Sequence, residues 1–143
     1  MIPPGHDFIH AEANVGSRSS YLDLTTEAGR QRGHRLLAET DVVVNNHRGD
    51  RLEALGLDPA ARARQYPGIV CVSVTCYGAT GPWAGRGGSD MNGSAASGLM
   101  TVEGTPEAPR LPVTGMINDF ITGYMGAVGA TAALLKRATE GGS

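Results

Sequence analysis

The stretch that decides the fold runs from Arg110 to Arg137 and reads RLPVTGMINDFITGYMGAVGATAALLKR. Its short apolar segment, residues 111–113, predicts a strand that ends at a turn formed by Thr114 and Gly115. A long helix follows and is predicted to begin near Asn118, which places Asp119 in its first turn. Small residues recur along this helix and favour close packing against another backbone; they are Gly123, Gly126, Ala127, Gly129, Ala130, Ala132 and Ala133.

Asp119 admits two interpretations. Acidic residues are common in first helical turns, because the carboxylate meets the positive end of the helix dipole, and Asn118 would then be the helix cap. The apolar turn before Asp119 instead favours a half-buried and reactive carboxylate. Residue type and position leave both interpretations open.

The upstream part of the chain alternates predicted strands and helices. Residues 42–44 are a continuous β-branched run, which is typical of a strand buried on both faces. A threonine at the start of the first helix is a predicted cap, and Leu36 and Leu37 are predicted to lie on the buried side of that helix. In order, the predicted elements are residues 19–24, 25–39, 42–44, 51–55, 58–65 and 69–74. This order predicts a parallel α/β sheet with right-handed crossovers.

A glycine-rich segment, TCYGATGPWAGRGGS at residues 75–89, leaves the carboxyl end of the third predicted strand. Open α/β sheets bind ligands at that edge. The segment lacks the spacing of a phosphate loop or of a dinucleotide fingerprint. A second small-residue helix is predicted over residues 90–100 and begins with Asp90. Two helices that each begin with an aspartate would face one another across a cleft.

Composition narrows the functional classes. The 143 residues suffice for one domain, and a net charge of −2 argues against a nucleic acid as partner. Cys71 and Cys76 are predicted to be reduced thiols, and no pattern of metal ligands accompanies them. No apolar run reaches membrane-spanning length and the first residues do not read as a secretory signal, so a cytoplasmic protein is expected.

Four stretches together resemble the class III CoA-transferases, a group that includes alpha-methylacyl-CoA racemases and carnitine-type CoA-transferases. They are SRSSYLDLTTEAGR, ETDVVVNNHRGDRLEALGLD, PGIVCVSVTCYGATGPWAGRGGSDMNGSAASGLM and MINDFITGYMGAVGATAALLKR. The resemblance covers the chain from about Pro3 to Gly142. It implies a Rossmann-like parallel sheet with flanking helices, with residues 1–143 as a truncated form of the family's large domain and no second domain.

The resemblance also implies a reaction and a site. Asp119 would attack the thioester of an acyl-CoA, forming an acyl-aspartyl anhydride and then an aspartyl-CoA thioester, from which CoA passes to a carboxylic acid acceptor. Helix-terminal N–H groups would keep Asp119 ionised. CoA is then a substrate, with no permanently bound cofactor and no metal. Residues implied to bind CoA are Leu22, Leu24, Thr25, Asn46, His47, Arg48, Arg51 and Leu55, with the two arginines suited to its phosphates.

Several positions depart from the family pattern. Ser89 stands where the racemases have a histidine before Asp90, and serine is a poor acid/base partner, so racemisation is disfavoured. Basic residues of the family are replaced by Thr25 and Ala54, which weakens phosphate binding, and His47 stands in place of an aromatic residue.

Family members are more than twice as long as this chain. The missing segments predict an exposed apolar patch, and therefore self-association or a complementary chain. Three hypotheses about the function of this chain follow. It is a catalytic Asp-bearing domain that is incomplete alone, a non-catalytic remnant that binds CoA or a partner, or a plain α/β domain with an oligomer interface. The match of four stretches disfavours the third.

Overall fold

The computed structural model describes residues 11–47 and 59–142. The chain divides into two compact units, Met1–Gly33 and His34–Ser143, with the division inside helix α2 (Glu27–Ala38). The predicted cap of this helix is confirmed, because Thr26 Oγ1 accepts the backbone N–H of Gly29 at 3.1 Å. The predicted buried side is wrong for Leu36, which is 49% exposed.

Residues 19–24 were expected to form a strand and do not. The side chain of Asp23 instead closes a turn, since its Oδ1 accepts the N–H of Thr25 at 3.0 Å and the Thr25 hydroxyl at 2.6 Å. Aspartate competes in this way with regular backbone pairing. Tyr21 is 87% exposed, whereas Leu22 and Leu24 are half-buried.

The second unit contains a parallel pair of strands, β1 (Val42–Asn45) and β2 (Val70–Ser73). Their register runs from the pair Val42–Val70 to the pair Asn45–Ser73. Helix α4 (Pro59–Gln65) precedes β2 and packs against it. The mixed α/β class and the parallel pairing are therefore confirmed, with a sheet of two strands in the described part of the chain.

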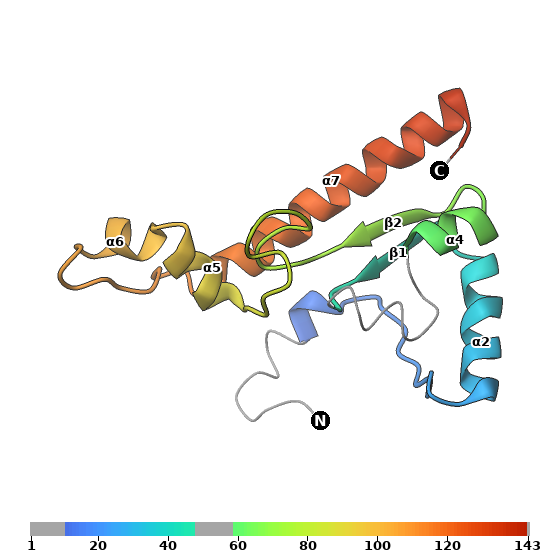
Figure 1. Cartoon of the computed structure of the whole chain (residues 1–143), viewed down its shortest axis with the longest axis horizontal. Coiled ribbons are helices and arrows are strands. Elements are labelled where there is room, and N and C mark those ends of the chain that lie inside the picture. The colour runs from blue at the N-terminus through green and yellow to red at the C-terminus, as the bar shows by residue number, and fades with distance from the viewer. Residues whose placement is uncertain (1–10, 48–58, 143) are drawn as a thin grey trace. The chain divides into compact units, whose positions relative to one another are not determined.

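Helix α7 (Ile117–Glu140) runs beside β2, as Figure 1 shows. At Gly126 an added methyl group would lie 3.5 Å from Val72 Cγ1, so the helix meets a side chain of β2 there and not the predicted backbone. Gly123 and Gly129 differ, because an added methyl group there would meet nothing within 4 Å among the described residues. Only part of the small-residue pattern therefore serves helix–sheet packing.

Arg137 fixes the last turns of α7 to the loops that lead into both strands. Its guanidinium donates to the carbonyl of Gly68 at 2.6 Å and to the carboxylate of Asp41 at 2.7 Å. Gly68 precedes β2 and adopts a φ of +94°, a left-handed conformation that favours glycine. One cationic side chain thus joins α7 to the two loops that lead into β1 and β2.

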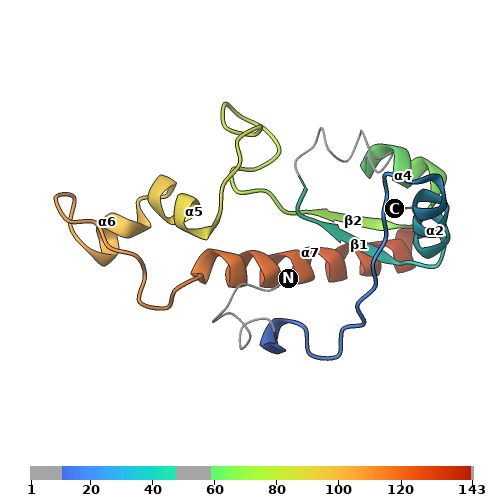
Figure 2. The same ribbon diagram turned by 90° about the horizontal axis from the view of Figure 1, so that it is seen from below.

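The single helix predicted over residues 90–100 is two helices, α5 (Asp90–Ala96) and α6 (Leu99–Glu103). Gly98 separates them with a φ of +80°. Helix α5 packs against α7, and Figure 2 shows α5 and α6 at the end of α7 that lies away from α4. The two helices with an aspartate in their first turn are in contact and are not separated by the predicted cleft.

The strand predicted over residues 111–113 is also absent. The chain turns there, with the N–H of Gly115 donating to the Pro112 carbonyl at 3.0 Å and the N–H of Ile117 to the Gly115 carbonyl at 2.8 Å. Proline has no N–H to give to a strand partner. Val113, which belongs to the predicted apolar strand, is 97% exposed.

Buried apolar side chains are few among the described residues. Ile69 and Val70 are the buried hydrophobic residues, and they lie at the start of β2. Both cysteines are present as thiols, as predicted. No helix in the described ranges is long and apolar enough to cross a membrane.

Candidate active site

Asp119 lies in the first turn of α7, which begins at Ile117, as the sequence predicted. The residue is exposed, and its backbone N–H donates to the Oδ2 atom of Asp90 at 3.0 Å. Asn118 is not the helix cap, because the residue before the helix is Met116. The Asp90 carboxylate of α5 therefore accepts a backbone N–H from the first turn of α7, in place of a local capping side chain.

Asp90, Ser94 and Asn118 form a polar cluster between α5 and α7. The Nδ2 atom of Asn118 donates to Ser94 Oγ at 2.7 Å and to the backbone carbonyl of Asp90 at 3.2 Å. Ser94 is fully buried and Asp90 is 8% exposed. Buried polar groups of this kind are stable only when paired, so the cluster fixes Asn118, and with it the neighbouring Asp119.

The electrostatic environment of Asp119 differs from the sequence-based expectation. Partial desolvation of its carboxyl raises the pKa of Asp119 above the ordinary value of 3.8, and the negative charge of Asp90 raises this pKa further. The helix terminus is expected to favour the ionised form, whereas partial desolvation and the charge of Asp90 act in the opposite direction. A carboxylate with a raised pKa holds its proton more tightly and is more basic once ionised.

Leu22, Leu24 and Thr25 occupy one turn in the first unit. The guanidinium of Arg30 donates to the carbonyls of Leu24 at 3.4 Å and of Thr25 at 3.0 Å, and pairs with Glu27 at 2.9 Å. The hydroxyl of Thr25 donates to Asp23, whose pKa is lowered by the hydrogen bonds from Thr25. This turn is therefore held by an arginine that sequence reasoning did not identify.

Asn46 and His47 follow β1 directly and are exposed, at the carboxyl end of the strand. The preceding Asn45 donates from Nδ2 to Ser73 Oγ at 3.0 Å, while its Oδ1 is buried and has no hydrogen-bond partner among the described residues. This amide was not predicted to belong to a site. Arg48, Arg51 and Leu55, and the substituted position Ala54, lie outside the described residues.

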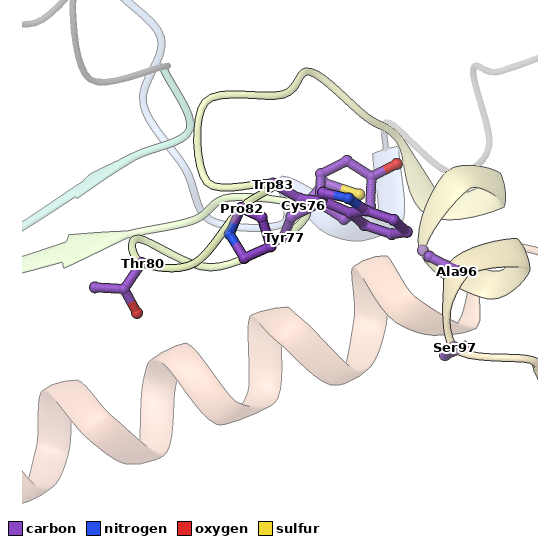
Figure 3. A pocket seen from close by; sticks show the side chains of 8 residues that line it. Cys76, Tyr77, Thr80, Pro82, Trp83, Ala96 and Ser97 are labelled. Atoms are coloured by element: carbon purple, nitrogen blue, oxygen red, sulfur yellow. The ribbon is translucent and has the colours of Figure 1, made fainter.

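The glycine-rich segment forms an open hollow of about 390 Å³ together with α5. Figure 3 shows Cys76, Tyr77 and Trp83 gathered on one side, near Ala96 of α5. The rings of Tyr77 and Trp83 meet edge to face with centroids 5.3 Å apart, and the Arg86 guanidinium lies 5.1 Å from the Trp83 ring. Desolvation raises the pKa of Tyr77, with a further contribution from Cys76.

One residue connects this hollow to the start of α7. Gly93 lines the hollow, and a methyl group added to it would lie 3.7 Å from the Asn118 side chain. Gly88 allows the segment to fold over Cys76, since a methyl group there would lie 2.9 Å from the Cys76 Cβ atom. The glycine content of residues 75–89 indicates that the backbone approaches other groups closely in this segment. It does not indicate which side chains come together there.

Among the described residues, no cluster suited to a metal ion is present.

Comparisons with known proteins find similarity over most of this chain. The model of CoA-transferase family III matches residues 3–143. A protein named as a probable fatty acyl-CoA transferase of Mycobacterium tuberculosis is 34% identical over 128 residues, covering 90% of this chain and 32% of its own length. Succinate–glutarate CoA-transferase of Agrobacterium fabrum is 32% identical over 134 residues, covering 94% of this chain and 33% of its own length.

Solved structures give the same relationship. A CAIB/BAIF family protein from Brucella suis superposes with a TM-score of 0.83 at 34% identity, over 89% of this chain and 34% of that protein. The chain thus spans about a third of the length of the proteins that it matches.

Proposed function

Because this chain belongs to CoA-transferase family III, we propose that it carries the nucleophile of a CoA-transferase site, and that this nucleophile is Asp119. The observation that supports the assignment is the placement of Asp119 in the first turn of α7, where Asp90 holds its backbone while the residue is exposed. An exposed carboxylate on a fixed backbone can meet the carbonyl of an incoming thioester. The raised pKa of Asp119 makes the ionised form more nucleophilic.

The proposed reaction exchanges CoA through two covalent intermediates. A carboxylate oxygen of Asp119 attacks the acyl-CoA carbonyl, the C–S bond breaks, and CoA leaves as a thiolate from an acyl-aspartyl anhydride. The thiolate then attacks the aspartyl carbonyl, which releases the donor acid and forms an aspartyl-CoA thioester. The acceptor carboxylate repeats this sequence in reverse, so that CoA ends on the acceptor and Asp119 is regenerated.

The start of α7 favours the charge that develops in these steps. Each carbonyl attack places negative charge on an oxygen beside Asp119, and the N-terminal end of a helix carries partial positive charge. The helix has 24 residues, so its dipole is fully developed at this end. No metal ion is needed for this chemistry.

We further propose that CoA contacts the turn at Leu22, Leu24 and Thr25 and the residues after β1. Asn46 and His47 are exposed at the carboxyl end of a parallel strand, which is where ligands bind in open α/β sheets. Arg48, Arg51 and Leu55 remain part of the proposal on sequence alone. The whole chain then represents part of the family's large domain, and the acyl and acceptor contacts are shared with segments outside it.

Covalent trapping tests the assignment of Asp119. The chain is incubated with an acyl-CoA, and intact-mass and peptide mass spectrometry follow the addition of CoA. We expect a mass gain of one CoA less one water on the peptide that contains Asp119, and none for Asp119→Asn. Glu107→Gln, which changes an exposed carboxylate after α6, is the matched control and should label as the parent chain does. Labelling that persists in Asp119→Asn would refute the nucleophile.

A non-catalytic remnant that binds CoA or a partner is the second candidate. The observation that favours it is Thr25, which stands where the family has a basic residue and gives both its hydroxyl and its N–H to Asp23. This position therefore offers no cation to a CoA phosphate. Calorimetry separates the two functions: CoA binding near the micromolar range, about −8 kcal/mol, without any covalent labelling would favour the remnant.

A further inference from the structure

Helix α7 starts without a side-chain cap of its own. Its cap position is Met116, whose side chain has no oxygen to accept a backbone N–H. The first N–H groups of a helix have no partner inside the helix and need an acceptor from elsewhere. Asp90 supplies this acceptor from α5, 29 residues earlier in the chain, with Oδ2 at 3.0 Å from the N–H of Asp119.

The same carboxylate is anchored on its other side. Its Oδ1 atom lies 3.3 Å from Asn118 Nδ2 and 3.4 Å from Ser94 Oγ, so both oxygens of Asp90 have donors. Asp90 is also the first residue of α5, where the positive end of that helix favours a negative charge. A buried carboxylate with these partners keeps one position, and so does the backbone that it caps.

Few other charged groups face Asp119. Helix α5 has no charged residue besides Asp90, and β2, the other element packed against α7, has Cys71 as its only titratable side chain. Within α7, the next charged residue after Asp119 is Lys136, more than four turns away. Asp90 is therefore the charge that acts on Asp119 within the elements packed around it.

We propose that Asp90 is a positioning residue for Asp119, capping the first turn of α7 across the helix interface and setting the charge around the nucleophile. This inference rests on the proposed function of Asp119. The two roles of Asp90 depend on different properties of its carboxylate: the cap needs an acceptor oxygen, whereas the electrostatic effect needs a negative charge. Substitutions can therefore separate the two roles.

Two variants make this separation. Asp90→Asn retains an oxygen that accepts the Asp119 N–H but removes the charge. Asp90→Ala removes both. Ser94→Ala is the control, since it deletes a member of the same buried cluster and leaves the carboxylate in place. Far-UV circular dichroism establishes that each variant retains its helices.

The measurement is an NMR titration of carboxyl-labelled aspartate in the full chain, with amide hydrogen exchange of the first turn of α7. In Asp90→Asn the pKa of Asp119 should fall toward its ordinary value while its amide stays protected. In Asp90→Ala, amide exchange of Asp119 should accelerate about tenfold or more. Ser94→Ala should leave the pKa of Asp119 nearly unchanged. An unchanged or higher pKa of Asp119 in folded Asp90→Asn would overturn the proposal.

The result of this experiment does not depend on the proposed function, because the titration uses no acyl-CoA. Covalent labelling of Asp119 together with an unmoved pKa in Asp90→Asn would retain the nucleophile and reject the positioning role. The expected pKa shift together with no labelling would retain the role of Asp90 in the fold and reject the nucleophile. When both hold, Asp90→Asn should also lower the rate of covalent labelling at neutral pH by several-fold, because the Asp119 carboxylate becomes less basic.

Discussion

Aspartate carboxylates accept hydrogen bonds at turns and helix ends in both units of this chain. Asp23 accepts the N–H and hydroxyl of Thr25, Asp41 accepts the Arg137 guanidinium, and Asp90 accepts the N–H of Asp119. Hydrogen bonds to an ionised carboxylate are stronger than neutral ones. Single carboxylates therefore hold turns and helix ends in a chain with few buried apolar side chains.

The raised pKa of Asp119 predicts a pH-dependent effect of Asp119→Asn on stability. A carboxyl whose pKa is higher when folded contributes favourably below its unfolded pKa, and this contribution is lost as the pH rises through the folded pKa. At pH 7 the ionised Asp119 is thus slightly unfavourable, and Asp119→Asn should raise the free energy of unfolding by roughly 0.5 kcal/mol, because solvent screens an exposed group. The gain should vanish below about pH 4. Urea unfolding at several pH values measures it, and a gain that grows toward low pH would contradict the sign.

Replacement of Arg137 is expected to lower the free energy of unfolding. Arg137→Met keeps the apolar part of the side chain and removes the bonds to Gly68 and Asp41, so the free energy of unfolding should fall by about 1–2 kcal/mol. The adjacent Lys136→Met is the control, because the Lys136–Glu140 pair is 3.8 Å long and exposed on both sides. Equal urea midpoints for the two variants would show that the Arg137 contacts contribute nothing.

At the scale of elements, the sequence predicted helices and central strands better than the segments around them. The positions of the strands near residues 42–44 and 69–74 and of the long helix from residue 117 were predicted correctly, because their patterns are strong and local. The first of these strands is not buried on both faces as predicted, since Val44 is 65% exposed. The strands predicted at 19–24 and 111–113 were wrong because Asp23 forms a side-chain turn and Pro112 lacks an N–H. The position of Asp119 was predictable, but its bond to Asp90 was not, since pairing between distant helices leaves no local pattern.

At the junction between the Asp23 turn and α2, Gly29 is expected not to tolerate replacement by a larger residue. A methyl group at Gly29 would overlap the Asp23 carbonyl, so Gly29→Ala should displace this turn and destabilise it by about 2 kcal/mol or more. Gly33→Ala is the matched control in the same helix, because its methyl group would meet only the Leu24 side chain at 3.3 Å. Hydrogen exchange at Thr25 and Gly29 should accelerate in the first variant only. Similar exchange in both would show that the turn adapts.

At the scale of the whole chain, α7 presents two different faces. From Gly126 onward, the partly buried residues of α7 follow a helical spacing and are mostly small. They are Gly126, Ala130, Ala133, Leu134 and Arg137, and the described contacts of this face include β2 and the loop at Gly68. A second stripe at helical spacing is large, apolar and exposed; it consists of Ile121, Tyr124, Met125, Val128 and Leu135. Exposed apolar stripes of this length are typical of interaction surfaces.

This second stripe predicts self-association of the isolated chain. Sedimentation velocity should show a weight-average mass that rises above 14.8 kDa with concentration. The double variant Tyr124→Glu, Val128→Lys should move the chain toward monomer, because burying either charge at an apolar contact is costly. Val113→Lys, at an even more exposed apolar residue in a loop, is the control and should leave association unchanged. A parent chain that stays monomeric across the concentration range would contradict the prediction.

The cap that Asp90 provides across the helix interface also determines how much sequence must be moved to transplant the proposed nucleophile. A graft of α7 alone onto another scaffold would carry Asp119 but leave its first turn without an acceptor, because Met116 cannot serve. The smallest portable module is the continuous segment from Ser89 to Glu140, which contains the capping helix, the connection and the capped helix. Protein engineers who recombine members of this family should place crossover points before Ser89, so that both aspartates come from the same parent.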